Sequence, residues 1–458
     1  MKKINIIYIA FLGVLLMACD NYLDIEPKKR KLLETAEEFS ALLENDMYFD
    51  FPHNDIGYLT GERFVMSESW LTEDNYPVIK ANVTFDERAD RAKFIETDRL
   101  YNSCYKRISN YNIVIENIDE SEGDTDLKQQ VKAQAQILRA YNYFFLVNFY
   151  AKHYQASSAS NDNGIILTFE LDLESVLKQY SVQEVYEAIG RDIEAAIEWL
   201  PETPNNTFRP GKAFGYALKA KVHLFKKEFD KALVAADQSL SYNDYIFDMV
   251  DYANQTAGNP FAVRVGYEMG EHNLFRYGWN SMGLYFSVVS PEFVQNFETG
   301  DLRLELFFRH NPNLIEGCMF YSLMNFAFEP NPGGLRSVEA LLMKAECLAR
   351  QGEVDAAMDL VNQLRAKRIR PENYVPLTAA NTQESMAVII DERARELNLT
   401  PNRYWDLRRL NTEPEYAVTL TRTYKGQTYT LEPESHLYIH PFSVEALSRN
   451  VNLKQNSK

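Results

Sequence analysis

A dense run of charged residues near the C-terminus is the part of this sequence best suited to chemistry. Asp391-Glu-Arg-Ala-Arg-Glu396 is followed by Arg403-Tyr-Trp-Asp-Leu-Arg-Arg409. Arginine forks pair bidentately with carboxylates, so the run could form an anion or sugar site or a partly buried ion-pair network. Because Ile389, Ile390 and Leu397 place one helix face in the core, we favour the structural network. Its expected members are Glu392, Arg393, Arg395, Glu396, Arg403, Asp406, Arg408 and Arg409.

The motifs of common enzymes are missing from the sequence. It has no Gly-x-Ser-x-Gly elbow, no phosphate-binding loop and no dinucleotide-binding glycine fingerprint. Gly278-Trp-Asn-Ser281-Met-Gly283 has the wrong spacing for an elbow. His436 and His440 lie four residues apart, but no His-Glu-x-x-His motif surrounds them. We therefore expect a protein that is not an enzyme and that holds no metal and no cofactor.

Aromatic residues are the second group suited to chemistry, because an exposed ring can act as a binding anchor. The chain has 28 Tyr, 27 Phe and 4 Trp, and many of them lie in two stretches without a helical period. Four stand among polar and turn-forming residues and are predicted to form a ligand face: Trp70, Tyr76, Tyr277 and Trp279. The alternative is that each ring pins its loop to the body of the protein.

Composition and charge limit the class of protein. The chain has 458 residues, enough for a large core, and its 19 Gly and 17 Pro are few, which favours helix over disorder. The formal net charge of −17 argues against nucleic-acid binding, which needs clustered Lys and Arg. Four Cys without a Cys-x-x-Cys pair exclude a disulfide scaffold and standard zinc modules, and we expect no disulfide.

The first nineteen residues have the pattern of an export signal. Lys2 and Lys3 precede an apolar run over 4–18, which is shorter than the roughly 20 residues of a membrane-spanning helix. The run ends in Leu16-Met17-Ala18-Cys19, which resembles a lipoprotein processing box. An ordinary signal peptide that carries a Cys is the alternative. We expect a signal peptide at 1–18 and, at 19–34, a tether lipidated on Cys19 and held by two or more acyl chains.

Helical periodicity dominates the remaining residues, 35–458, which are predicted to form a single domain. Apolar residues at helical spacing predict long helices over about 97–118 and 127–150. Residues 213–240 and 338–366 each predict a helical hairpin with the small/aromatic/small spacing of a tetratricopeptide unit.

The two aromatic stretches, about 48–80 and 241–335, interrupt this scaffold. A stretch that long without a helical period is usually a functional insertion with some structure of its own. Alternation around Gly426 predicts a small β-hairpin near the C-terminus. The predicted fold class is therefore mostly α: a tetratricopeptide-like helical-hairpin scaffold with long irregular, partly β insertions.

Several motifs, in this order, resemble the SusD/RagB family of surface lipoproteins. They are Cys19-Asp-Asn-Tyr-Leu-Asp24, Tyr105-x-x-Ile108-x-x-x-Asn112, Leu138-Arg-Ala-Tyr141, Leu342-Met-Lys-Ala-Glu-Cys-Leu-Ala349, Glu392-Arg-x-Arg-Glu-Leu397 with Arg403-Tyr-Trp-Asp-Leu-Arg-Arg409, and Asn450-Val-Asn-Leu-Lys-Gln-Asn456. The resemblance covers nearly the whole mature chain. Asn398-Leu-Thr-Pro-Asn402 and His440-Pro-Phe442 depart from the family's usual pattern and indicate a divergent branch.

The resemblance implies a SusD-like fold and a non-enzymatic role in nutrient capture. Proteins of this kind sit on a TonB-dependent, SusC-like outer-membrane transporter and deliver oligosaccharides to it, or oligopeptides in the RagB-like branch. The implied location is the outer membrane, lipid-anchored and exposed at the cell surface. The aromatic insertions favour an oligosaccharide. A tetratricopeptide scaffold that binds only proteins and a hydrolase are two competing hypotheses for the function of this chain.

Overall fold

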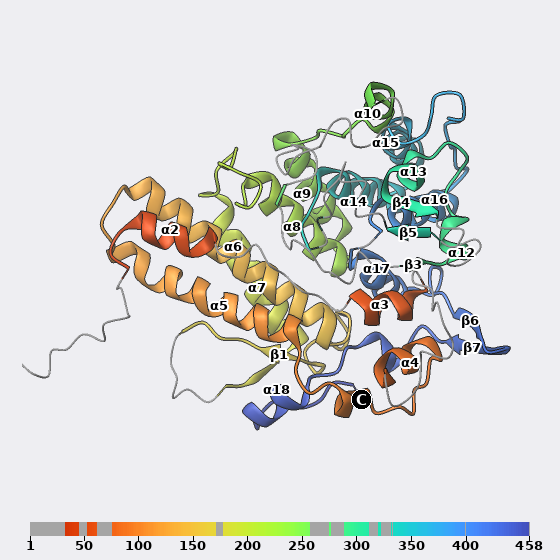
Figure 1. Cartoon of the computed structure of the whole chain (residues 1–458). Helices are drawn as coiled ribbons and strands as arrows, with labels where there is room; N and C mark the ends of the chain where they lie inside the picture. Colours follow the sequence, from red (N-terminus) through yellow and green to blue (C-terminus); the bar gives the residue numbers. More distant parts are fainter. Residues whose placement is uncertain are drawn as a thin grey trace, which may run out of the picture.

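The computed structural model describes residues 33–44, 53–61, 76–170, 177–256, 274–275, 288–310, 319–321, 331, 333–398 and 400–457. Helices dominate these residues, as predicted (Figure 1). The helices of the first part are α2 (Ala36–Glu44), α3 (His53–Thr60), α4 (Pro77–Val83), η2 (Arg91–Phe94), α5 (Arg99–Asn117), η3 (Ile118–Glu120), α6 (Thr125–Tyr150), α7 (Val182–Ile197), α8 (Lys212–Phe225), α9 (Phe229–Tyr242) and α10 (Met249–Thr256). Those of the second part are α12 (Pro291–Val294), α13 (Leu302–Phe307), α14 (Ser337–Arg350), α15 (Val354–Ala366), α16 (Thr382–Glu396), α17 (Asn402–Leu410), η4 (His436–Tyr438) and α18 (Val444–Arg449).

The two longest helices, α5 and α6, confirm the periodicity of the sequence. Each begins at an aspartate whose carboxylate accepts a backbone N–H of the first turn: Asp98 from Tyr101 at 3.2 Å and Asp124 from Leu127 at 2.9 Å. In Figure 1 the two helices run together toward the left of the molecule, with α2 beside them.

Both predicted helical hairpins are present, α8 with α9 and α14 with α15. Small buried residues, among them Ala220 and Ala232 in the first hairpin and Ala345 and Ala357 in the second, let the paired helices approach closely. The turn of the second hairpin also contacts the first turn of α9, because Gln351 Nε2 donates to Asp230 Oδ1 at 2.7 Å.

Among the described residues, short antiparallel strands form three small sheets. One pairs β1 (Asn163–Ile166) with β2 (Gln179–Ser181), and a second has the order β3 (Val288–Val289), β5 (Met319–Tyr321), β4 (Phe308–His310). The third is the predicted hairpin, β6 (Leu420–Tyr424) with β7 (Gln427–Leu431). Its turn residues Lys425 and Gly426 have φ values of 51° and 74°, as the favoured two-residue hairpin turn requires.

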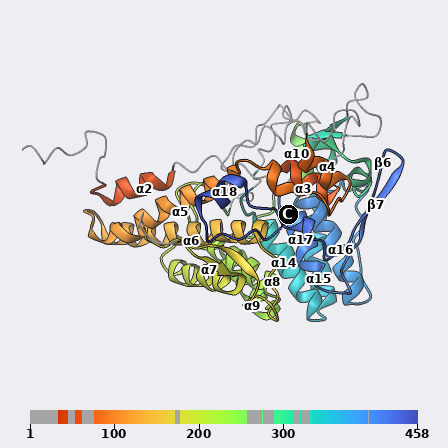
Figure 2. The ribbon, with the colours of Figure 1, turned by 90° about the horizontal axis from the view of Figure 1, so that it is seen from below.

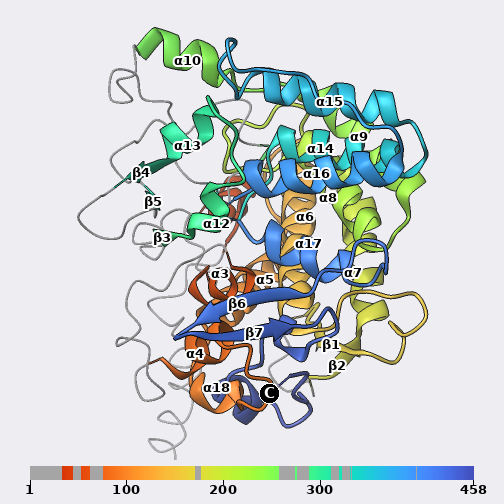
Figure 3. The same cartoon turned by 90° about the vertical axis from the view of Figure 1, so that its right-hand side faces the viewer.

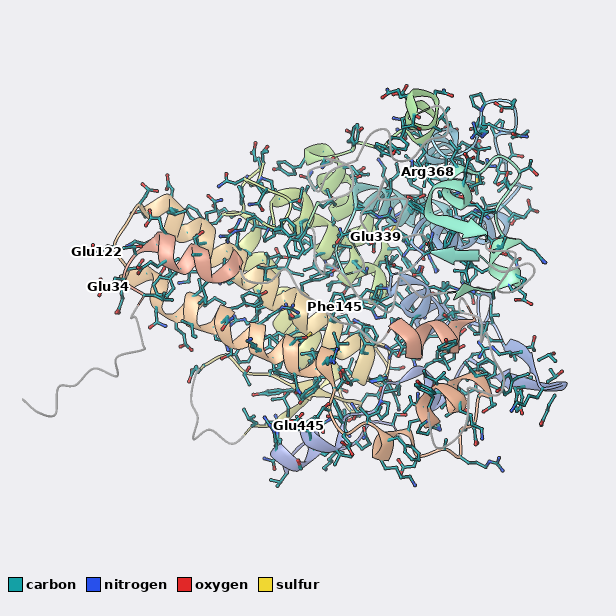
Figure 4. All side chains as sticks on the ribbon, in the orientation of Figure 1. Glu34, Glu122, Phe145, Glu339, Arg368 and Glu445 are labelled. Carbon is teal, nitrogen blue, oxygen red and sulfur yellow. The ribbon has the colours of Figure 1, made fainter. Side chains whose placement is uncertain are left out.

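The main core lies where α6 meets α8 and α17. Trp405 is buried there, with its ring centroid 5.0 Å from that of Phe145 and 5.4 Å from that of Phe144. Lys221 Nζ lies 4.6 Å from the Trp405 ring and 2.6 Å from Glu339 Oε1. Figure 4 labels Phe145 and Glu339 in the centre of the molecule.

The first described residues are attached to the turn between α5 and α6. Ala36 N donates to the Glu122 carbonyl and Glu122 N to the Glu34 carbonyl, both at 2.8 Å, and Figure 4 shows Glu34 and Glu122 at the same end of the molecule. Thr35 and Glu38 exchange the two hydrogen bonds of the capping box at the start of α2. The chain therefore enters the domain at the far tip of the α5–α6 pair.

Candidate functional site

Arg303, at the start of α13, is the centre of a buried cluster of charged side chains. Its guanidinium lies 2.7 Å from Asp301 Oδ2, 2.6 Å from Glu392 Oε1 and 3.0 Å from Glu396 Oε2. All four side chains have an exposed fraction of 0%. A ligand cannot reach these charges while the domain is folded, so the cluster is structural and not an open anion or sugar site.

The cluster extends from Glu392 and Glu396 to further arginines. Glu392 Oε2 accepts from Arg395 at 2.8 Å, and Glu396 accepts from Arg368 at 3.0 Å and from Arg336 at 3.3 Å. Burial alone would raise the pKa of both carboxyls, but the surrounding guanidinium groups outweigh it and hold each pKa below its usual range.

A second set of ion pairs joins α14, α16 and α17. Asp406 accepts from Arg393 and from Arg409, both at 2.8 Å, and Arg409 also reaches Glu346 at 2.6 Å. Burial would raise the pKa of Asp406, but the two arginines lower it well below its usual range. Six of the eight predicted members thus form ion pairs in two separate sets: Glu392, Arg395 and Glu396 around Arg303, and Arg393, Asp406 and Arg409 in this second set.

Two predicted members have other roles. Arg408 donates to the backbone carbonyls of Asn148 and Ala151, and so satisfies the end of α6 instead of pairing with a carboxylate. Arg403 is half-buried and forms no ion pair with any residue in the described part of the chain. Arg403 and Arg408 both lie on α17. On the same helix, Asp406 contacts Arg393 of α16 and Arg409, whereas Arg403 takes no part in these contacts.

The charged residues clamp the second insertion onto the helical scaffold. Arg365 Nη2 holds both oxygens of Glu298 at 2.8 and 2.7 Å, and Arg370 Nη2 holds both oxygens of Glu305 at 3.0 and 2.8 Å. Arg368 donates to the Phe247 carbonyl. Figure 3 shows α10, α12, α13 and strands β3 to β5 on one side of α14, α15 and α16, and Figure 4 labels Arg368 at this junction.

Backbone hydrogen bonds complete this clamp. Leu302 N donates to the Arg368 carbonyl at 2.9 Å, Arg370 N to the Gly300 carbonyl at 3.0 Å, and Met249 N to the Lys367 carbonyl at 3.0 Å. Residues 365–370 therefore fix both the beginning and the later part of the insertion. The only sequence signal for this role is a strongly basic run, Arg365-Ala-Lys-Arg-Ile-Arg370, in an acidic chain.

Of the predicted ligand-face residues, the structure describes Tyr76. It precedes the first residue of α4, and its exposed fraction is 37%. Trp70, Tyr277 and Trp279, and the predicted lipidation site Cys19, lie outside the described residues. The ligand face stays a prediction at these positions.

His436 and His440, which are four residues apart in the sequence, make separate contacts. His436 Nε2 forms a hydrogen bond with the Glu87 carbonyl at 2.9 Å, whereas His440 Nε2 lies 3.4 Å from Asp98 Oδ2.

Among the residues with described positions, no group of His, Cys, Asp and Glu could hold a metal ion. Cys104 and Cys347 are both buried, and Cys347 is a free thiol. None of the described helices is long and apolar enough to cross a membrane.

Two family models match this chain. Residues 21–224 match the model described as starch-binding associating with outer membrane, and residues 334–458 match that of the SusD family. SusD-like protein P2 of Formosa agariphila is 26% identical over 422 residues, which cover 77% of this chain and 79% of the relative. SusD-like protein P38 of the same organism is 24% identical over 491 residues, covering 91% and 93%.

Solved structures share the fold over nearly the whole chain. A SusD-like carbohydrate binding protein from Bacteroides vulgatus superposes with a TM-score of 0.68 and 19% identity, over 92% of this chain and 98% of that structure. Surface glycan-binding protein A from Bacteroides uniformis gives a TM-score of 0.72 and 16% identity, over 92% and 99%. At these identities the likeness concerns the fold.

Proposed function

The chain belongs to the SusD family, and from this membership we propose that it captures an oligosaccharide nutrient and delivers it to a SusC-like, TonB-dependent transporter. The observation that carries the proposal is the agreement of the whole fold with proteins described as binding carbohydrate or glycan. In this role the chain binds its ligand without chemical change and needs no cofactor.

The proposed ligand face consists of Trp70, Tyr76, Tyr277 and Trp279. The ion pairs of Arg303, Arg365 and Arg370 support this proposal indirectly, because they fix the described parts of the second insertion to α15, to α16 and to the segment between them. A rigid support keeps aromatic rings in place before the ligand arrives, and so reduces the entropy lost on binding.

The proposed anchor is a lipid on Cys19, with the mature chain beginning there. Leu33, the first described residue, lies fourteen positions along the chain from Cys19, and an extended chain spans at most about 3.6 Å per residue. The tip of the α5–α6 pair, where Glu34 is bonded to Glu122, would then lie within about 50 Å of the membrane surface.

Affinity electrophoresis of the purified chain tests the ligand class. Native gels would contain one soluble polysaccharide each, and the same protein would be titrated with oligopeptides of mixed sequence. Retardation by at least one polysaccharide is the expected result. Binding of oligopeptides alone would instead place the chain with the RagB-like branch. Release of sugars from a retarding polysaccharide would contradict the non-enzymatic role.

A further inference from the structure

Within the described part of the chain, neither outer edge of the β6–β7 hairpin pairs with another strand. Tyr424 and Gln427 flank the two-residue turn and so form a hydrogen-bonded pair, and such pairs alternate with non-hydrogen-bonded ones along the register. The backbone N–H and C=O groups of the alternate residues therefore point away from the partner strand. These residues are Thr421 and Thr423 on β6 and Thr428 and Thr430 on β7. None of the four has a further backbone hydrogen bond in the described structure, and all four are exposed.

The edge of β1 is closed, in contrast. The Gly164 carbonyl accepts from Asn456 Nδ2 at 3.0 Å and from Gln179 Nε2 at 3.1 Å. The Ile166 carbonyl accepts from the Tyr105 hydroxyl at 2.8 Å. At β1 the fold uses side chains to satisfy strand carbonyls, whereas at β6–β7 it leaves them available.

The hairpin is attached to α4 by hydrogen bonds. Its strand β7 lacks the features that usually protect an exposed strand edge from pairing. Arg422 Nη1 donates to the carbonyls of Asn82 at 3.2 Å and Val83 at 3.1 Å, which ties β6 to the end of α4. β7, Gln427-Thr-Tyr-Thr-Leu431, contains no charged residue, no Pro and no Gly. Natural edge strands are usually protected by charge, Pro or a bulge against pairing with another chain. Figures 1 and 2 both place the hairpin at the outer rim of the molecule.

We propose that the free edge of β7 pairs with an extended strand of the transporter to which this chain delivers its ligand. The inference rests on the proposed function. Thr428 and Thr430 present N–H and C=O groups about 6.8 Å apart, a spacing that matches the alternate residues of an extended polypeptide. The uncharged strand offers no electrostatic attraction, so a polypeptide backbone is the partner that its hydrogen-bonding groups fit best.

The test compares Thr430→Pro with Thr430→Val in the full-length, tagged chain extracted from its own outer membrane with mild detergent. Proline at position 430 removes the outward backbone N–H but leaves the hydrogen bonds between β6 and β7 in place. Valine keeps the outward N–H. The TonB-dependent barrel that copurifies is quantified by mass spectrometry. We expect at least a tenfold lower yield with Thr430→Pro and an unchanged yield with Thr430→Val. Hydrogen exchange over 427–431 should slow in the wild-type complex.

The outcomes separate this inference from the proposed function. Absence of a barrel from the wild-type preparation contradicts the proposed function and, with it, this inference. Equal yields from Thr430→Pro and Thr430→Val contradict only the assignment of the β7 edge. A loss with Thr421→Pro in place of Thr430→Pro would also overturn it, because the contact would then lie on β6. A wild-type dimer that Thr430→Pro converts to monomer would overturn it too, because the partner strand would then be a second copy of this chain.

Discussion

Replacing Arg303 should destabilise the domain much more than replacing Arg370, although each arginine connects the second insertion to the scaffold. Arg303 is fully buried, and its removal leaves Asp301 without its guanidinium partner and weakens the pairing of Glu392 and Glu396. Removing one partner of a buried pair costs about 3–5 kcal/mol. Arg370 and Glu305 are 34% and 49% exposed, so Arg370→Ala should cost about 0–1 kcal/mol.

Urea unfolding followed by circular dichroism measures this difference as a shift in the midpoint. Hydrogen exchange over 288–310 is the second readout, because loss of the clamp should release this segment before the helical hairpins unfold. Arg303→Lys keeps the charge but not the planar fork, so its effect should lie between those of wild type and Arg303→Ala. Equal midpoints for Arg303→Ala and Arg370→Ala, with unchanged exchange over 288–310, would refute the clamp.

The two sets of ion pairs and the lipid site give three more expected outcomes. Arg393→Ala should lower the free energy of unfolding by about 3–5 kcal/mol and Arg403→Ala by less than about 1 kcal/mol, and chemical denaturation of the two variants side by side checks this. Because the pKa values of Glu396 and Asp406 are lowered in the folded state, their stabilisation is complete above the usual carboxyl pKa of about 4 and is lost on acidification below it. The melting temperature should therefore change little between pH 7 and pH 5 and fall steeply toward pH 3, and a flat profile would count against the ion pairs. Labelling with a palmitate analogue should mark the wild type and not Cys19→Ala, and equal labelling would disprove lipidation there.

Local pattern is enough to predict the helices, because their determinants lie within a few residues of each other. The capping box of Thr35 and Glu38 and the apolar spacing of α5 and α6 are properties of short windows. The β6–β7 hairpin likewise depends on one turn, in which Gly426 adopts a φ of 74°.

The partners of the charged residues cannot be predicted in the same way, because they come from distant parts of the chain. Arg303 and Glu392 are 89 residues apart, and no spacing rule connects them. On α17 the helical period sets the angle between two side chains but not which of them meets a neighbouring helix. For this reason the pattern wrongly predicts a network role for Arg403, and wrongly predicts a carboxylate partner for Arg408, which bonds two carbonyls of α6.

The central claim, capture of an oligosaccharide by aromatic residues of the insertions, is tested most directly by calorimetric titration of Trp279→Ala. The ligand is an oligosaccharide prepared from a polysaccharide that retards the wild type in the gel. Trp199→Ala is the matched control, because Trp199 is 46% exposed and follows the end of α7 in the scaffold. A desolvated aromatic anchor contributes about 2 kcal/mol, so Trp279→Ala should weaken binding more than tenfold at an unchanged melting temperature. Unchanged binding by Trp279→Ala with a melting temperature lowered by several degrees would show that Trp279 pins its loop, and would contradict the claim.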